Sequence, residues 1–218
     1  MPVPATICGS LGRMLTSPDN VVIRPYKESD RADCFDICLR TADAGKDATG
    51  LYSSDDLMPE LFFAPYVQLD PGLAFVVDTG TRVVGYVIAT ADTREFVRRY
   101  RAELLADFAA AHPLGDPASS HEALMVSLGH DPERMLLPEI DQYPAHLHID
   151  LLPEAQRSGL GRRLIEIERA ALARRGVPAV HLTMADDNRS ARTFYDRLGF
   201  RLLSTGDGVS TLGIPTAP

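Results

Sequence analysis

The sequence predicts an α/β protein, and three observations support that fold class. Apolar strand-like runs and amphipathic helix-like runs follow one another along the chain after residue 20. Glycine and proline stand at many of the boundaries between these runs, as they do at turns. In the last third, a strand-like run at 146–152 leads through a glycine-containing turn into a helix-like run that ends at 175. We expect a central sheet of about seven strands flanked by helices.

The first part of the chain predicts an arm, one strand and two helices. Prolines and glycines without periodicity indicate an N-terminal arm over residues 1–20. The runs that follow predict, in order, a strand at 21–25, a helix capped by Ser29 and Asp30 and running to about 42, a break at 45–50, and a second helix that begins at Ser53 and Ser54 and includes Phe62.

A hairpin and a long insertion occupy the middle of the chain. The strand-like runs at 73–78 and 82–89 are separated only by a Thr-Gly-Thr segment, which predicts a β-hairpin. Apolar residues at helical spacing predict a helix over 93–111. Prolines, glycines and short apolar clusters follow at 112–143, so we expect residues 93–143 to be a helical and loop insertion.

The C-terminal third has the clearest pattern. It predicts a strand at 145–152, a helix at 157–175 with Gly176 at its C-cap, a strand at 179–184, a helix capped by Asn188 and ended by Gly199, and short strands at 200–203 and 209–214. We expect the whole chain, residues 1–218, to be one domain.

The composition excludes several classes of protein. The chain has 218 residues, of which 45% are hydrophobic and 24% charged, and its formal net charge is −8. This acidic balance argues against binding to nucleic acids or to an anionic membrane surface. No apolar stretch reaches membrane-spanning length and the N-terminus lacks a secretory pattern, so we expect a cytoplasmic protein. Cys8, Cys34 and Cys38 complete no zinc pattern, and we interpret them as small core residues.

The turn at 156–161, QRSGLG, is the most informative segment. The first backbone N–H groups of a helix have no intrahelical partner and lie at the positive end of the helix dipole, so they bind phosphates. Glycines at 159 and 161 keep those N–H groups accessible. A P-loop lysine is absent, and Leu164 stands where a dinucleotide fingerprint has its third glycine. The turn predicts a site for a nucleotide-bearing ligand, and an ordinary glycine turn is the alternative.

Two segments together resemble the GNAT superfamily of acyl-CoA-dependent N-acetyltransferases. Residues 151–161, LLPEAQRSGLG, fit the first signature of that family at each position. Residues 188–200, NRSARTFYDRLGF, fit the second signature, which has an Asn, then Ala, then Phe-Tyr, then Leu-Gly-Phe. These two motifs cover residues 145–203, which the resemblance implies to be the core that binds acetyl-CoA.

A looser resemblance extends over most of the chain. The segments at 23–26, 43–45 and 85–92 and the long insertion after Phe96 are similar to the acetyltransferase-like domain at the C-terminus of O-GlcNAcase. That domain is a doubtful enzyme, but this chain keeps the turn at 156–161, which favours coenzyme binding here.

The resemblance to GNAT enzymes implies a fold, a cosubstrate and a set of site residues. The sheet is mixed and mostly antiparallel, and it splays between the strands at 145–152 and 179–184. Acetyl-CoA is the cosubstrate, with its pantetheine arm paired to exposed backbone in that gap. The implied coenzyme contacts are Leu151, Leu152, Gln156, Arg157, Ser158, Gly159, Leu160, Gly161, Arg162, Asn188, Ala191 and Tyr195, and no metal ligands are expected.

Two of these residues have expected chemical roles. The backbone N–H of Leu151 is the expected donor to the thioester oxygen as that oxygen gains charge. Tyr195 matches the general acid of the family, whose hydroxyl lies near the sulfur. A core tyrosine that packs the last helix is the alternative for Tyr195.

The strand at 145–152 supplies candidates for the general base. Because side chains alternate along a strand, His146, His148 and Asp150 share one face. Polar groups repeated on one face are costly to bury, so we expect this face to meet a cleft. Asp150 is our first candidate for the base or for the carboxylate that binds the amine, and His148 is the second. A structural role is the alternative for His148 and His146, and is expected for His181.

The expected function is direct transfer of an acetyl group to a primary amine in a ternary complex, because no cysteine lies near the motifs to form an acyl-enzyme. The amine is a small molecule or a lysine, and acidic side chains in the cleft favour a cationic one. Further acidic residues in loops near the expected site are Asp43, Asp47, Asp186 and Asp187. The alternative function is a module that binds acetyl-CoA or a protein partner without turnover. We expect a monomer or a homodimer.

Overall fold

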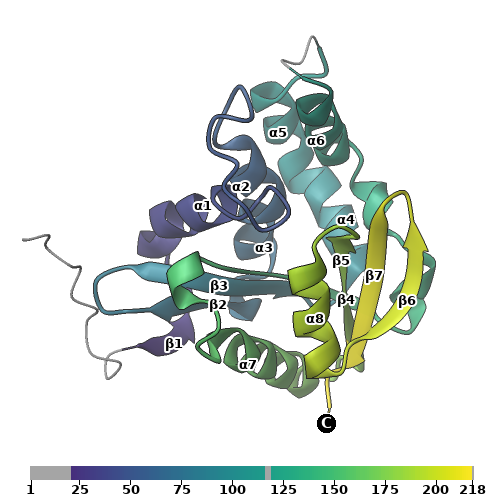
Figure 1. Cartoon of the computed structure of the whole chain (residues 1–218). Coiled ribbons are helices and arrows are strands. Elements are labelled where there is room, and N and C mark those ends of the chain that lie inside the picture. The colour runs from purple at the N-terminus through teal and green to yellow at the C-terminus, as the bar shows by residue number, and fades with distance from the viewer. Residues whose placement is uncertain (1–20, 116–118, 218) are drawn as a thin grey trace, which may run out of the picture.

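One seven-stranded sheet runs through the molecule, as expected (Figure 1). The structure, a computed structural model, describes residues 21–115 and 119–217, so the predicted N-terminal arm and Cys8 lie outside the described residues. The strand order is β1-β2-β3-β4-β5-β7-β6. The strands are β1 (Val22–Pro25), β2 (Ala74–Asp78), β3 (Val83–Thr90), β4 (Ala145–Leu151), β5 (Ala179–Ala185), β6 (Arg201–Gly206) and β7 (Val209–Pro215). All neighbouring strands are antiparallel except β4 and β5, which are parallel.

Helices cover both faces of this sheet. They are α1 (Arg31–Leu39), α2 (Leu57–Phe62), α3 (Ala64–Leu69), α4 (Thr93–Arg99), α5 (Leu105–Ala111), α6 (Ser120–His130), α7 (Leu160–Arg174) and α8 (Arg189–Leu198). In Figure 1, α1, α2 and α3 lie on one side of the sheet and α7 lies on the other. Within the described ranges, no helix has the length and apolar character needed to cross a membrane.

The predicted start of the first helix is confirmed, since α1 begins directly after Asp30, whereas the predicted start of the second helix is wrong. In both cases the expected capping side chain has another partner. Asp30 does not cap α1, which follows a short 3-10 turn. Its carboxylate instead accepts two hydrogen bonds from Arg24, 2.6 and 2.8 Å long. Ser53 hydrogen-bonds to Glu122 of α6 through both its backbone N–H and its hydroxyl. This contact holds the segment before α2 against α6, so the helix begins only at Leu57.

The predicted helix over 93–111 is confirmed, with one irregularity. It consists of α4, a π-helical stretch at Tyr100–Leu104 and α5, which follow one another without a break. Asp92 caps its start, because the side chain accepts from the backbone N–H groups of residues 94 and 95. The remainder of the insertion contains α6 and two short 3-10 turns at 132–135 and 138–141.

The two helices of the last third end where glycine predicts. Asn188 caps α8 by accepting from the N–H of Ala191 at 3.0 Å. Gly199 ends α8 with a φ of 88°, and Gly176 ends α7 with a φ of 76°. Helix α7 begins at residue 160 rather than 157, because Arg157 has a φ of 59°, which no helix continues through.

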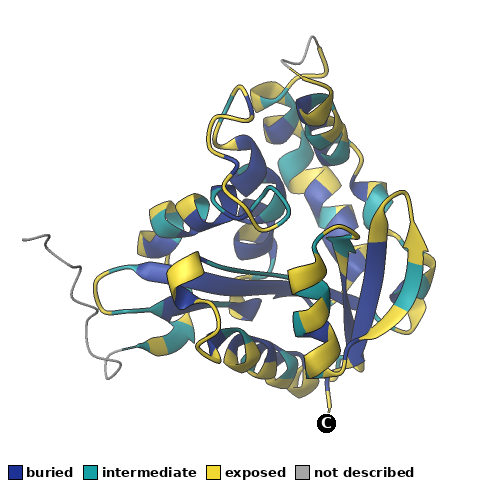
Figure 2. Cartoon of the chain, in the orientation of Figure 1, coloured by how far each residue is buried: buried dark blue, intermediate teal, exposed yellow. Residues whose placement is uncertain are grey.

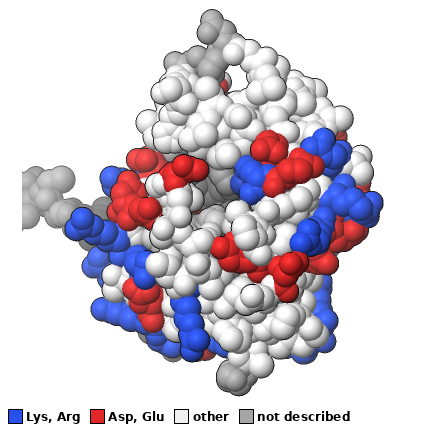
Figure 3. All heavy atoms as spheres, turned by 90° about the vertical axis from the view of Figure 1, so that its right-hand side faces the viewer, with Lys and Arg blue, Asp and Glu red and all other residues white. Residues whose placement is uncertain are grey.

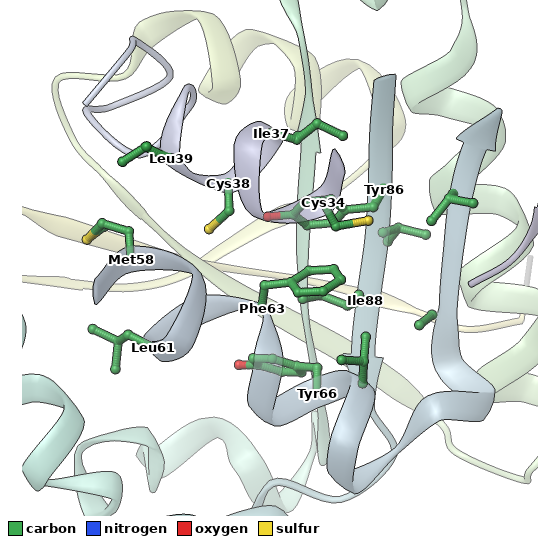
Figure 4. Packing of buried hydrophobic residues seen from close by; sticks show 14 of the residues in the cluster. Cys34, Ile37, Cys38, Leu39, Met58, Leu61, Phe63, Tyr66, Tyr86 and Ile88 are labelled. Atoms are coloured by element: carbon green, nitrogen blue, oxygen red, sulfur yellow. The ribbon is translucent and has the colours of Figure 1, made fainter. Parts of the chain in front are cut away.

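Buried residues face one another between the sheet and α1 to α3, where Figure 2 shows dark blue segments. Sulfur and aromatic side chains are part of this core. Cys34 and Cys38 are 0% and 3% exposed, which confirms them as buried core residues. Figure 4 shows both cysteines on α1 beside Tyr86 of β3, with Phe63 below them. The rings of Phe63 and Tyr86 lie 4.9 Å apart between centroids. This layer fixes the position of β3, against which β4 is paired.

Glu168 on α7 is buried without a partner. Its side chain is 0% exposed, and neither carboxylate oxygen has a hydrogen-bond partner in the part of the chain that the structure describes. Burial raises the pKa of Glu168 well above its ordinary value, because the charged form loses its hydration. The folded protein therefore favours the neutral carboxyl.

We expect Glu168→Gln to raise the free energy of unfolding at pH 8 by about 1–2 kcal/mol and to change it little at pH 4. The pKa of Glu168 is higher in the folded than in the unfolded state, so the wild type loses stability as pH rises from the unfolded-state value toward the folded-state value. Urea denaturation at both pH values measures this difference. The control is Glu166→Gln, an exposed position on the same helix. An equal gain at pH 4 and pH 8 would contradict the account.

Candidate active site

The sheet opens between β4 and β5. These parallel strands have seven residues each but pair only at Ala145 with Val180 and at His146 with His181. Beyond these two pairs the strands separate, so the remainder of β4 has a paired edge toward β3 and an unpaired edge toward β5. The splay expected between 145–152 and 179–184 is confirmed.

Backbone N–H groups of β4 point into this gap. The N–H of Leu152 donates to the carbonyl of Val84 at 3.0 Å, toward β3. Because successive N–H groups of a strand alternate in direction, those of Leu151 and Ile149 point the other way, toward β5. Leu151 was expected here from the sequence. Ile149 was not, although the two-residue alternation along the strand predicts that it shares the orientation of Leu151.

The turn after β4 presents a row of uncapped N–H groups. Gly159 is the N-cap residue of α7, with a φ of 83°, and no side chain caps the helix. The first backbone hydrogen bond of α7 runs from Arg163 to the carbonyl of Gly159 at 3.2 Å. The N–H groups of residues 160–162 therefore have no helical acceptor. A Cβ atom at Gly159 would meet nothing within 4 Å, so the space beside this end of the helix is open.

Other residues of the turn hold its shape. Gln156 donates from Nε2 to the carbonyl of Leu151 at 2.9 Å, and the Ser158 hydroxyl donates to the carbonyl of Ala155 at 2.6 Å. Gly161 serves a packing purpose as well, because a Cβ atom there would lie 3.1 Å from the ring of Phe194 on α8. The glycine at 161 thus permits the close contact of α7 with α8, in addition to the access proposed from the sequence.

The remaining expected coenzyme contacts lie at the rim of the same region. The side chain of Asn188 is engaged in capping α8, and Ala191 supplies the N–H that it caps. The loop after α1 approaches this cap, since a Cβ atom on Gly45 would lie 3.5 Å from Nδ2 of Asn188. Arg157 and Arg162 are exposed, and the side chain of Arg162 lies 4.0 Å from Glu166 on the helix surface.

Tyr195 lies on the inner side of α8. It is 8% exposed and packs between the rings of Phe194 and Phe200, with centroids 5.2 Å from each. Among the described residues, no hydrogen-bond partner of its hydroxyl is found. Burial raises the pKa of Tyr195, and the charge of Asp150 raises it further.

Asp150 lies on the opposite face of the sheet from α7. Its carboxylate accepts a hydrogen bond of 2.7 Å from the hydroxyl of Tyr86 on β3. Burial raises the pKa of Asp150, while the hydrogen bond from Tyr86 partly opposes that rise. A carboxylate with a raised pKa is a stronger proton acceptor than an exposed aspartate.

The loop carboxylates are mainly engaged in their own surroundings. Asp47 accepts from the backbone N–H and the hydroxyl of Thr49, at 2.9 and 2.6 Å. Asp186 accepts from the hydroxyl of Ser210 at 2.6 Å. Asp43 forms a backbone bridge with Lys46. Figure 3 shows acidic and basic side chains mixed over the face that it presents.

Comparison with known proteins identifies the family. Residues 134–202 match the family model of the acetyltransferase (GNAT) domain. The chain also aligns with the crystal structure of SsHAT at 50% sequence identity, over 91% of this chain and 100% of that chain, with a TM-score of 0.87. The chain belongs to the GNAT acetyltransferases.

Two more distant GNAT-fold structures share the architecture of this GNAT protein. PaiA N-acetyltransferase from Thermoplasma acidophilum, solved in complex with coenzyme A, is 11% identical over 89% of this chain and 98% of that chain, with a TM-score of 0.56. Polyamine N-acetyltransferase of Drosophila melanogaster is 17% identical over 89% of this chain and 99% of that chain, with a TM-score of 0.56. At these identities the likeness shows the fold alone. As a GNAT acetyltransferase, the protein is an acyltransferase with acetyl-CoA as its cosubstrate.

In this GNAT protein the histidines of β4 belong to a buried hydrogen-bond chain. The Thr93 hydroxyl donates to the carbonyl of Pro144 at 2.7 Å, so it accepts from Nδ1–H of His146 at 2.8 Å. Nε2 of His146 then accepts from the Tyr66 hydroxyl at 2.7 Å, which leaves the Tyr66 oxygen to accept from Nε2–H of His148 at 3.0 Å. Both histidines are thereby assigned as neutral tautomers.

The environment of these histidines is less polar than the sequence suggested. His146 is buried under the rings of Tyr66 and Phe96, and only a small cavity, which His148 also lines, lies against this face. Burial lowers the pKa of His148 to about 4 and that of His146 well below its ordinary value. The imidazole of His181 donates from Nδ1–H to the backbone carbonyl of Tyr143 at 2.8 Å, as a structural histidine does.

Proposed function

We propose that the protein transfers an acetyl group from acetyl-CoA directly to a primary amine bound in the same ternary complex, with Asp150 as general base and Tyr195 as general acid. The observation that carries this proposal is the open edge of β4. There, two N–H groups face the gap, while Asp150 lies on the same strand and the buried Tyr195 on α8.

The residues present fit acetyl-CoA at both ends. The uncapped N–H groups of residues 160–162 match a diphosphate, and the N–H groups of Leu151 and Ile149 match the amide and thioester oxygens of the pantetheine arm. Bound acetyl-CoA supplies an acetyl group activated as a thioester.

Asp150 and Tyr195 then carry out the two proton transfers that the reaction needs. Asp150 accepts a proton from the amine, which frees the nitrogen lone pair for attack on the acetyl carbon. As the new C–N bond forms and the C–S bond breaks, Tyr195 donates a proton to the departing sulfur. The products are an N-acetylated amine and the free thiol of coenzyme A. The raised pKa of Tyr195 keeps its phenol protonated, which is the state a proton donor needs.

His148 is the weaker candidate for the base. Its pKa of about 4 makes it a poor proton acceptor at neutral pH, and its Nε2–H is engaged with Tyr66. Asp150 combines a raised pKa with a position on the same strand as the gap-facing N–H groups.

Release of free thiol from acetyl-CoA, measured over a panel of primary amines, tests the proposed function. Calorimetry with acetyl-CoA provides the independent measure of coenzyme binding. Amine-dependent thiol release is the expected result. Tight coenzyme binding without release on any amine would instead favour a module that holds acetyl-CoA without turnover.

Two finer assignments belong to the same proposal. The ordered insertion between β3 and β4 supports a closer kinship, within the GNAT family, with the acetyltransferase-like domain of O-GlcNAcase. A cytoplasmic location would give the enzyme access to acetyl-CoA.

We expect Tyr86→Phe to move the acidic limb of the pH profile of kcat/KM upward by about one pH unit. The Tyr86 hydroxyl lowers the pKa of Asp150, so its removal raises that pKa and the base ionises only at higher pH. Rates measured from pH 5 to 9 provide the check. Tyr26→Phe, which removes a hydroxyl bonded to Glu28 instead, is the matched control. An unmoved acidic limb in Tyr86→Phe would exclude Asp150 as the base.

A further inference from the structure

A small cavity lies where β4 and β5 separate. Its volume is about 70 Å³. Leu147 and His148 of β4 form one wall, Leu182 and Thr183 of β5 form another, and Arg134 from the 3-10 turn at 132–135 also lines it. The last paired residues of the two strands, His146 and His181, lie at the same place. The cavity therefore occupies the closed end of the gap.

The coenzyme's reactive end points toward this cavity. The uncapped N–H groups of residues 160–162 lie beyond the C-terminal end of β4, at the open end of the gap. A coenzyme held there by its diphosphate and paired along Leu151 and then Ile149 runs toward the closed end. The next residues of β4 along that path are His148 and Leu147, which line the cavity. An acceptor that meets the acetyl group from the far side is thus in contact with the cavity wall.

The charge in that wall is an arginine without a carboxylate partner. Nε of Arg134 donates to the carbonyl of Leu128 at 2.8 Å, and its guanidinium lies 5.9 Å from the ring centroid of Phe62. In the part of the chain that the structure describes, no carboxylate lies within 4.0 Å of Arg134, and its two terminal nitrogens make no hydrogen bond. The guanidinium is thus half-buried, and its two terminal nitrogens are accessible to a ligand that offers two acceptors.

No other lining residue neutralises this charge. The other polar side chains of the cavity are Tyr66, Thr183 and the three histidines His146, His148 and His181. The histidines are neutral at pH 7, because burial lowers the pKa of each, to about 4 in His148. The positive charge of Arg134 contributes to that lowering in His148. The cavity is therefore a small space with a positive wall.

We propose that Arg134 binds a carboxylate of the acceptor, so that the substrate is a small amine that also carries a carboxylate, as an amino acid does. The inference rests on the function proposed above. A planar carboxylate matches two parallel N–H groups of a guanidinium. The cavity of about 70 Å³ suits a small polar group such as a carboxylate.

This assignment adds an anionic group to the cationic amine that was expected from the sequence. That expectation depended on acidic side chains in the cleft, but Asp47 and Asp186 are engaged in local hydrogen bonds and Asp150 is bonded to Tyr86. A diamine would bring its second ammonium group to the guanidinium of Arg134, where like charges repel. Diamines and polyamines are therefore expected to be poor substrates.

Matched acceptor pairs test the proposal. Glycine, β-alanine and 4-aminobutyrate are each compared with the amine that lacks the carboxylate, namely methylamine, ethylamine and propylamine, and 1,4-diaminobutane is added. For at least one pair, kcat/KM in the wild type is expected to be at least 10-fold higher for the carboxylate-bearing amine, and the diamine is expected to be the poorest acceptor. In Arg134→Met that preference is expected to vanish, through a higher KM for the amino acid and an unchanged KM for the plain amine.

Two further measurements separate this inference from the proposed function and from misfolding. Calorimetric titration of 4-aminobutyrate and propionate into the wild type saturated with coenzyme A needs no turnover, and binding that is lost in Arg134→Met supports the carboxylate site. Arg94→Met, at an exposed arginine paired with Asp141, is the control for stability and for coenzyme affinity. Equal kcat/KM across every pair, or a preference for the diamine, overturns the proposal even if acetyl transfer itself is confirmed. Failure of all amines together with absent carboxylate binding overturns both.

Discussion

Gly159→Glu is expected to raise the Kd for acetyl-CoA by about 100-fold or more, because it places a carboxylate in front of a helix N-terminus that binds a diphosphate. The N–H groups of residues 160–162 have no helical acceptor and no side-chain cap, and the space before them is open. A glutamate at 159 fills that space and repels the phosphates. Calorimetry with acetyl-CoA and with coenzyme A measures the loss.

The same helix offers a matched control at its other end. Gly176 also has a positive φ, 76° against 83° at Gly159, and a Cβ atom there likewise meets nothing within 4 Å. Gly176→Glu therefore carries a similar conformational cost, about 1–2 kcal/mol for a side chain in the left-handed region, without facing the coenzyme. Equal coenzyme affinity in both variants would show that the turn at 156–161 is not the diphosphate site.

Tyr195→Phe is expected to lower kcat by about 100-fold with little change in the Kd for acetyl-CoA, since general acid catalysis contributes to the rate and not to ground-state binding. The ring remains in place between Phe194 and Phe200, so packing is preserved and only the proton donor is lost. Single-turnover rates with saturating coenzyme, alongside calorimetry, separate the two effects.

A series of thioester donors with different leaving thiols sharpens this test of Tyr195. Thioester donors with more acidic leaving thiols need less protonation at sulfur, so the deficit of Tyr195→Phe is expected to shrink as the thiol pKa falls. A loss of coenzyme affinity with an unchanged rate per bound coenzyme would mean that Tyr195 is a packing residue, the alternative that its buried position between two aromatic rings also fits.

Local sequence signals were sufficient for most of the elements. The hairpin joining β2 and β3, the asparagine cap of α8 and the glycines that end α7 and α8 each depend on residues within a few positions of one another. The opening of the sheet between β4 and β5 followed from the resemblance of two motifs to the GNAT family, and the structure confirms it. The start of α2 was less predictable, because Ser53 bonds to Glu122 of α6 instead of capping the helix.

The residues that line the gap between β4 and β5 could be predicted from the sequence only in part. The residues of the turn carry a motif, whereas Tyr66 and Arg134 carry none and reach the site from segments outside it. The contact of Tyr66 with His146 joins residues 80 positions apart, and no local pattern contains it. The same contact explains why the histidine face is buried: α3 packs over it and supplies the hydroxyl that satisfies both imidazoles.

A crystal structure of the complex with acetyl-CoA tests the central claim most directly. The account predicts that the diphosphate accepts hydrogen bonds from the N–H groups of residues 160–162, that the pantetheine arm pairs with Leu151 in the gap between β4 and β5, and that the sulfur lies beside the Tyr195 hydroxyl. A coenzyme bound outside this gap, or a Tyr195 hydroxyl directed away from the sulfur, would contradict it.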